Sequence, residues 1–195
     1  MQLYYALVHY PAIDTARIEA FAAKYNPWPR MRPHLTLIYP VPEEIGEAAL
    51  AAHIEAVLRA WPPFPIHIAG FHLSWDFWLF LTLQAGREEM TRLHDALYDG
   101  PPAPYRIPDI AFVPHIGLGF FARQPAAYDP FAPAKLELDG ERYAAARREA
   151  ESLALDYYTV VDRLTFLKLS RDLQHIEPLR EFALGGKPRL IAAGA

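Results

Sequence analysis

The sequence predicts a fold of strands and helices in which one unit occurs twice, each copy in the order strand, helix, loop, strand, helix, strand. Apolar residues change repeatedly between the spacing of strands and the spacing of helices along the 195 residues. The letters PHLTL at residues 33–37 return as PHIGL at residues 114–118, at the same point of each half. An internal repeat is first of all evidence of architecture. We therefore expect two related lobes.

The first half opens with a short aromatic segment that Pro11 ends, as expected of a strand. Asp14 can cap the helix that follows, and Asn26 and Pro27 end it. A basic loop broken by prolines, residues 29–33, then leads into the strand that carries the first repeat. The expected elements of this half are a strand over residues 3–10, a helix over 14–25, a strand over 34–39, a helix over 43–61 and a strand over 64–73.

The second half follows the same order, with a proline-rich loop at residues 100–106 before the strand that carries the second repeat. Its expected elements are a strand over residues 77–83, a helix over 86–98, a strand over 115–121, a helix over 140–155, a strand over 160–169 and a last strand over 175–184. The chain is predicted to be one domain over residues 1–195, with lobes at about 1–75 and 76–184 and a loose tail at 185–195.

The composition restricts the classes of function. No cysteine occurs, which excludes disulfides, zinc sites built on thiolates and a cysteine nucleophile. A formal net charge of −4 does not suit a protein that grips long duplex nucleic acid, because such proteins carry a basic face. The first residues lack the pattern of a signal peptide, and the densest apolar run, residues 77–81, is too short to span a membrane. We expect a cytoplasmic monomer that does not act at a membrane.

The repeats place two histidines, His34 and His115, at equivalent positions of the two lobes. Because side chains alternate along a strand, His34 shares a face with Thr36, and His115 shares a face with Gly117. The opposite face of each strand is apolar and suits the core. The face with the histidine carries only small or hydroxylic neighbours, which leaves room for a ligand. If the two strands lie side by side, both imidazoles face one cleft.

A pair of imidazoles suits phosphodiester chemistry. One proton must leave the attacking oxygen and another must reach the leaving oxygen, and histidine, with a reference pKa of about 6.5, can serve either step. The Thr36 hydroxyl can donate to a non-bridging phosphate oxygen. A lone histidine is more often structural. We expect this of the remaining six: His9, His53, His67, His72, His94 and His175. For His34 and His115 the repeat favours the paired role.

The two motifs resemble those of the two-histidine (2H) phosphoesterase superfamily, also called the 2′-5′ RNA ligase-like or cyclic phosphodiesterase family. Its signature is His-x-Thr/Ser-x followed by an apolar residue, present twice and roughly eighty residues apart. Here the two histidines are 81 positions apart, and the order of elements resembles the family over almost the whole chain, including residues 162–167. The resemblance implies a bilobal α+β fold, with the active site in the cleft between two antiparallel sheets related by a pseudo-twofold axis.

The resemblance also implies roles for individual residues. His34 and His115 are the expected catalytic pair, and Thr36 is expected to bind phosphate. Gly117 stands at the second phosphate-binding position, where the family has threonine or serine. Arg32 falls on the face of His34 if the strand extends backwards, and it can contact a phosphate. No motif in the sequence predicts a metal site or a cofactor.

The leading hypothesis is a metal-independent phosphodiesterase that acts on 2′,3′-cyclic phosphate ends or 2′-5′ linkages of RNA or nucleotides. The resemblance adds reversible 2′-5′ RNA ligation without ATP. Two alternatives remain open. Gly117 motivates a module that binds nucleotides or RNA ends but has lost turnover, and the two histidines on their own are also compatible with a metal-binding domain.

Overall fold

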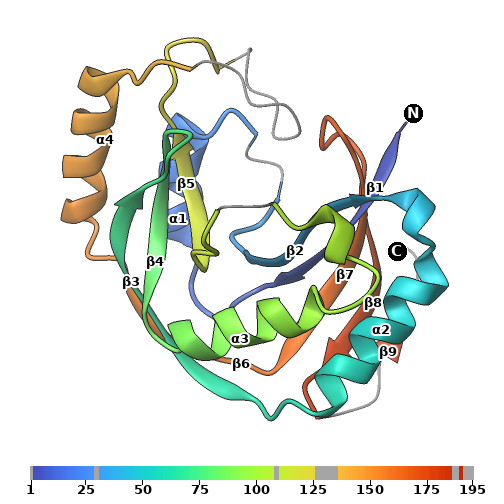
Figure 1. Cartoon of the computed structure of the whole chain (residues 1–195). Coiled ribbons are helices and arrows are strands. Elements are labelled where there is room, and N and C mark those ends of the chain that lie inside the picture. Colours follow the sequence, from blue (N-terminus) through green and yellow to red (C-terminus); the bar gives the residue numbers. More distant parts are fainter. Residues whose placement is uncertain (1, 29–30, 108–109, 126–135, 186–188, 191–195) are drawn as a thin grey trace.

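Two antiparallel sheets form the framework of the computed structural model, which describes residues 2–28, 31–107, 110–125, 136–185 and 189–190 (Figure 1). The first sheet has the order β2-β1-β7-β8-β9 and the second has the order β5-β4-β3-β6. The strands of the first sheet are β1 (Leu3–His9), β2 (Leu35–Pro42), β7 (Arg163–Ser170), β8 (Ile176–Ala183) and β9 (Arg189–Leu190). Those of the second are β3 (Phe64–Leu73), β4 (Trp78–Ala85), β5 (His115–Phe120) and β6 (Asp156–Val161). The predicted α+β class with antiparallel sheets is confirmed.

Each of the two sheets takes strands from both halves of the chain, and the expected lobe bounds at about 1–75 and 76–184 stay a prediction. Strand β3 comes from the first half but lies in the second sheet, and β7 and β8 come from the second half but lie in the first sheet. The reason is local, because a four-residue turn at residues 74–77 forces β3 to pair with β4. The first half thus contributes β3 to the second sheet, and the second half contributes β7, β8 and β9 to the first.

One predicted strand is in fact two. The segment expected as a single strand over residues 160–169 breaks at Asp162, where the chain leaves the second sheet at the end of β6 and enters the first as β7. The predicted tail at 185–195 lies largely outside the described residues. Within it, the short strand β9 pairs with β8.

Four α-helices accompany the sheets: α1 (Ala16–Tyr25), α2 (Glu47–Arg59), α3 (Arg87–Leu97) and α4 (Gly140–Ser152), with short 3-10 turns at η1 (Glu43–Ile45) and η2 (Ala103–Tyr105). The helix expected over residues 43–61 is interrupted at Gly46, whose φ of 84° lies in the region that favours glycine and ends the 3-10 turn before α2 starts. No helix in the described part of the chain is long and apolar enough to cross a membrane.

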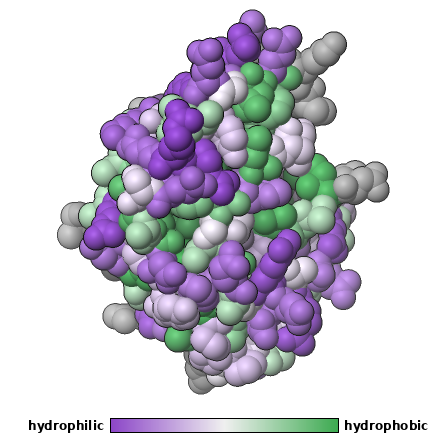
Figure 2. Space-filling view, turned by 90° about the vertical axis from the view of Figure 1, so that its left-hand side faces the viewer, coloured by the Kyte–Doolittle hydropathy of each residue, from purple (hydrophilic) through white to green (hydrophobic). Residues whose placement is uncertain are grey.

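A single cluster of buried residues joins both sheets to all four helices. It occupies one face of each sheet, and the half-buried residues of the two histidine motifs lie on the other face. A second, smaller cluster covers that other face of the first sheet and consists of Tyr4, Ala6, Val8, Leu167 and Leu169. The side of the molecule that carries α4 is mostly hydrophilic with smaller apolar areas (Figure 2). The charged face of α4 fits this, since Arg147 pairs with Glu151 at 2.7 Å.

Candidate active site

The two repeats meet at the centre of the fold, because β2 and β5 lie side by side (Figure 1). His34 directly precedes β2, and His115 is the first residue of β5. The alternation expected from the sequence is present in both strands. Leu35 and Leu37 are fully buried, as are Ile116 and Leu118, whereas both histidines are only half-buried. We call the face with the histidines the open face of each sheet.

The two imidazoles are held in the same way. Nδ1 of His34 lies 2.7 Å from the carbonyl oxygen of Arg32, and Nδ1 of His115 lies 2.6 Å from that of Val113. A carbonyl oxygen can only accept, so Nδ1 must be the nitrogen that carries hydrogen in each ring. Nε2 is then the nitrogen that takes up or delivers a proton. Two histidines oriented alike by the carbonyl two residues earlier are equivalent by geometry as well as by sequence.

The surroundings of both rings favour the neutral imidazole. Burial lowers the pKa of His34, and the hydrogen bond to the Arg32 carbonyl opposes this. Burial lowers the pKa of His115 to about 4, against the opposing effect of the Val113 carbonyl, and positive charge on His34 and His72 lowers it further. The two histidines are thus near enough for positive charge on His34 to lower the pKa of His115.

The other predicted phosphate-binding positions also lie on the open faces. Thr36 pairs with Val8 of β1 and is half-buried. Gly117 pairs with Phe80 of β4 and is half-buried as well. The side chain of Arg32 is exposed, and its guanidinium lies 4.3 Å from the ring centroid of Tyr10. Arg30, which also belongs to the basic loop, lies outside the described residues.

Three side chains near the pair were not among the predicted site residues. Phe80 stacks on the His115 ring with 3.4 Å between centroids and 16° between planes. Tyr10 meets the His34 ring edge-on at 6.1 Å. His72, which we expected to be structural, is exposed, lies 6.5 Å from Phe80 and acts on the pKa of His115. Of these, Tyr10 could have been found from the sequence. Alternation places it on the same face as Val8, two residues earlier, and Val8 pairs with Thr36.

Four of the other histidines are engaged in structural hydrogen bonds. His9, His53 and His94 each contact a backbone carbonyl, at 2.9, 2.9 and 2.8 Å. His67 contacts the Asp156 carboxylate at 3.0 Å. In the described part of the chain, no group of three or more histidine and acidic side chains is placed to hold a metal ion.

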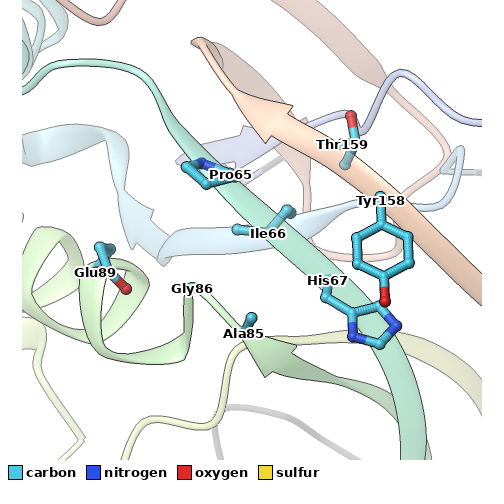
Figure 3. Close-up of a pocket in the computed structure, with 8 residues that line it drawn as sticks. All are labelled: Pro65, Ile66, His67, Ala85, Gly86, Glu89, Tyr158 and Thr159. Carbon is cyan, nitrogen blue, oxygen red and sulfur yellow. The ribbon is translucent and has the colours of Figure 1, made fainter.

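A pocket of about 300 Å³ lies elsewhere, between the ends of β3, β4 and β6 and the start of α3 (Figure 3). Figure 3 shows His67 beside the ring of Tyr158, on which it stacks at 4.1 Å, with Glu89 on the opposite side. Neither His34 nor His115 lines this pocket. Because its only histidine is already bonded to Asp156, the pocket offers no second pair of histidines, and the candidate active site remains the open faces of β2 and β5.

Comparisons with known proteins agree with the fold described above. No curated protein sequence matches the chain. Among solved structures, LigT of E. coli in complex with NADP+ superposes with a TM-score of 0.54 at 20% identity, covering 95% of this chain and 98% of that one. A crystal structure described as a phosphoesterase gives 0.55 at 18% identity, covering 94% and 97%. Usb1 of Kluyveromyces marxianus with uridine monophosphate gives 0.50 at 10% identity, covering 90% and 96%.

At such identities these structures show a shared fold and no more. The match to the sequence model of one family is stronger evidence, because it covers residues 8–173 and so includes both histidine motifs. The chain therefore belongs to the 2′-5′ RNA ligase superfamily, the 2H phosphoesterases.

Proposed function

We propose that the protein is a metal-independent phosphodiesterase that acts on 2′,3′-cyclic phosphates or 2′-5′ phosphodiester bonds of RNA ends or nucleotides. The observation that carries the proposal is the matched pair of imidazoles, each with its Nδ1–H bonded to a carbonyl and its Nε2 left for proton transfer. Membership of the 2H phosphoesterases supports the reaction class. LigT and Usb1 have been crystallised with nucleotides, which supports a nucleotide or RNA end as the substrate here.

In hydrolysis of a 2′,3′-cyclic phosphate, water attacks the phosphorus and one P–O bond to the ribose breaks. One histidine takes the proton from the attacking water through Nε2. The other donates its Nε2 proton to the ribose oxygen that leaves, and the product is a phosphate monoester. The Thr36 hydroxyl donates to a non-bridging oxygen and stabilises the charge that develops there. In ligation a 5′-hydroxyl attacks the phosphorus in place of water, the bond from phosphorus to the ribose 3′ oxygen breaks, that oxygen takes up a proton, and a 2′-5′ bond forms without ATP.

The electrostatics divide the two roles. A general base must be neutral before it can accept a proton, and His115, with a pKa of about 4, meets this condition most fully. His34 is then the acid. The negative charge of a bound phosphate stabilises the imidazolium and so raises the pKa of His34 once substrate is present. We propose His115 as base and His34 as acid in hydrolysis, in a cytoplasmic monomer that needs no cofactor.

Purified protein is expected to hydrolyse a 2′,3′-cyclic nucleotide, and EDTA is expected to leave the rate unchanged. The two imidazoles supply both proton transfers, so no metal-bound water is needed. Product formation is measured by chromatography before and after dialysis against chelator. Loss of activity on chelation, with recovery on adding a divalent metal, would favour a metal-binding site. Nucleotide binding without turnover would instead identify a binding module.

The dependence of kcat/KM on pH is expected to be a bell whose optimum lies below pH 6.5. A lowered pKa keeps the base unprotonated to a lower pH, which moves the acid limb of the profile to lower pH. A lowered pKa also makes the acid lose its proton earlier, which moves the alkaline limb down. Because kcat/KM reports the free enzyme, initial rates at low substrate are the measurement, with circular dichroism at each pH as the control for folding. An optimum above pH 7.5 contradicts the lowered values.

A further inference from the structure

The strands that carry the two histidine motifs lie in different sheets. Among the described strands, β2 pairs only with β1, and β5 pairs only with β4. The hydrogen bonds of each ladder therefore fix a motif within its own sheet and not relative to the other motif. The apolar core joins the two sheets, but apolar contacts have no direction. A directional contact that joins β2 to the start of β5 can therefore determine how His34 stands to His115.

His94 of α3 makes such a contact on both sides. Its side chain is buried, and its Nδ1 lies 2.8 Å from the carbonyl oxygen of Leu37 on β2. Because a carbonyl oxygen only accepts, Nδ1 carries the hydrogen. The imidazole stacks on the ring of Phe112, with 3.9 Å between centroids and 1° between planes. Phe112 directly precedes Val113, whose carbonyl oxygen holds Nδ1 of His115. One side chain thus contacts the first motif strand and the segment that enters the second.

The free edge of β2 needs partners from α3, which lies beside it (Figure 1). An edge strand presents backbone groups that no neighbouring strand satisfies. The helix satisfies two of them, because His94 donates to the Leu37 carbonyl and the Tyr98 hydroxyl accepts the N–H of Tyr39 at 3.1 Å. Tyr98 lies four residues after His94, so both side chains belong to one face of the helix. The imidazole alone combines a donor for β2 with the flat ring on Phe112.

We propose that His94 is a positioning residue that fixes the place of His34 relative to His115. The proposal rests on the proposed function, since it assumes that both imidazoles act on one phosphate. The N–H of His94 holds β2 three residues after His34, and its ring supports the segment whose carbonyl orients His115. When either contact is lost, the separation of the two Nε2 atoms is no longer fixed. The transition state, in which both protons move, then loses more stabilisation than bound substrate does.

Two substitutions separate the two contacts. His94→Asn keeps an N–H at the place of Nδ1 and removes the ring, whereas His94→Phe keeps a ring and removes the N–H. Each is expected to lower kcat for 2′,3′-cyclic AMP about tenfold, with KM changed by less than about threefold, and His94→Leu should lower kcat by about 10²-fold. Rates are expressed per folded molecule, with the folded fraction taken from thermal melts. His53→Leu is the matched control and should keep its kcat, because His53 bonds the Leu97 carbonyl at 2.9 Å and so joins α2 to α3.

A measurement without substrate tests the contact that reaches His115. Long-range ¹H–¹⁵N spectra of histidine side chains, recorded above the ordinary histidine pKa of about 6.5, show which ring nitrogen carries the hydrogen. His115 should be the Nδ1–H tautomer in the wild type and in His94→Phe, and this fraction should fall in His94→Asn, where the stack on Phe112 is lost.

The two measurements distinguish the possible failures. If the wild type does not turn over the cyclic nucleotide, the proposed function fails, while the spectra still test the positioning role. A lower melting temperature with unchanged kcat per folded molecule in His94→Leu shows a purely structural residue and overturns the proposal. An unchanged His115 tautomer in His94→Asn overturns it as well.

Discussion

Replacing either His34 or His115 by alanine is expected to lower kcat/KM for a 2′,3′-cyclic nucleotide by roughly 10²-fold or more. Each variant loses one of the two imidazoles that we propose as proton carriers, and the remaining imidazole cannot deliver and remove protons at once. Stopped assays with high enzyme concentration measure the residual rate. The double variant is expected to be little slower than either single one, because the two groups act as a unit and their effects do not add.

His67→Ala is the matched control for this experiment. That histidine also lies on the second sheet, but its Nε2 is bonded to Asp156 and its ring stacks on Tyr158, away from β5. The control variant should keep nearly full activity, and thermal melts should show that all variants remain folded. Near-normal turnover in either His34→Ala or His115→Ala contradicts the paired mechanism, whatever the control shows.

The histidine pair could be predicted because its evidence is local. Alternation along a strand fixes which face a side chain occupies, and the repeated Pro-His-x-x-Leu pattern marks the same point of each lobe. The fully buried Leu35 and Leu37, against half-buried His34 and Thr36, show that this inference depends only on the strand itself. The carbonyl partners two residues earlier were not predictable, because they depend on how the chain enters each strand.

The partners of β3 and β7 could not be predicted from alternation. Alternation shows which face of a sheet a side chain occupies, but not which strand lies beside it. A second repeat does mark the two strands as equivalent. LSWDF at residues 73–77 ends β3, and LSRDL at residues 169–173 ends β7. In both turns the serine hydroxyl donates to the aspartate two residues later, at 2.5 and 2.6 Å. Both turns also hold an apolar residue at positive φ, Phe77 at 69° and Leu173 at 56°. This repeat relates β3 to β7.

The neighbours of the catalytic pair were missed for a related reason. Phe80 and His72 reach His115 across two strands, and cross-strand contacts follow from register. The register of β4 on β5 shifts between Leu79 and Phe80, so counting along the two strands does not align Phe80 with Gly117. Only the paired strands show that Gly117, Phe80 and His72 form one row on the open face.

Thr36→Ala is expected to reduce kcat by roughly 10²-fold while leaving the protein folded, because Thr36 is the one hydroxyl that the two motifs retain. With Gly117 at the other position, no second motif side chain shares the charge on the phosphate. Thr36→Ser is the control and should keep most of the activity, since it preserves the donor. Steady-state kcat with a small cyclic nucleotide is the measurement.

Gly117→Ser then tests whether the phosphate lies between these strands. The added Cβ meets only the Trp78 ring, at ordinary contact distance, so the variant should fold. The new hydroxyl should lie on the same face of β5 as the side chain of His115. In a Thr36→Ala background, this serine should restore part of the lost rate, because it supplies a donor from the opposite side of the same phosphate. In the otherwise unaltered protein it should speed hydrolysis of a small substrate, because it adds a donor to the charge on the phosphate. If neither Thr36→Ala nor Gly117→Ser changes the rate, the phosphate binds elsewhere, since two groups that flank it cannot both be without effect.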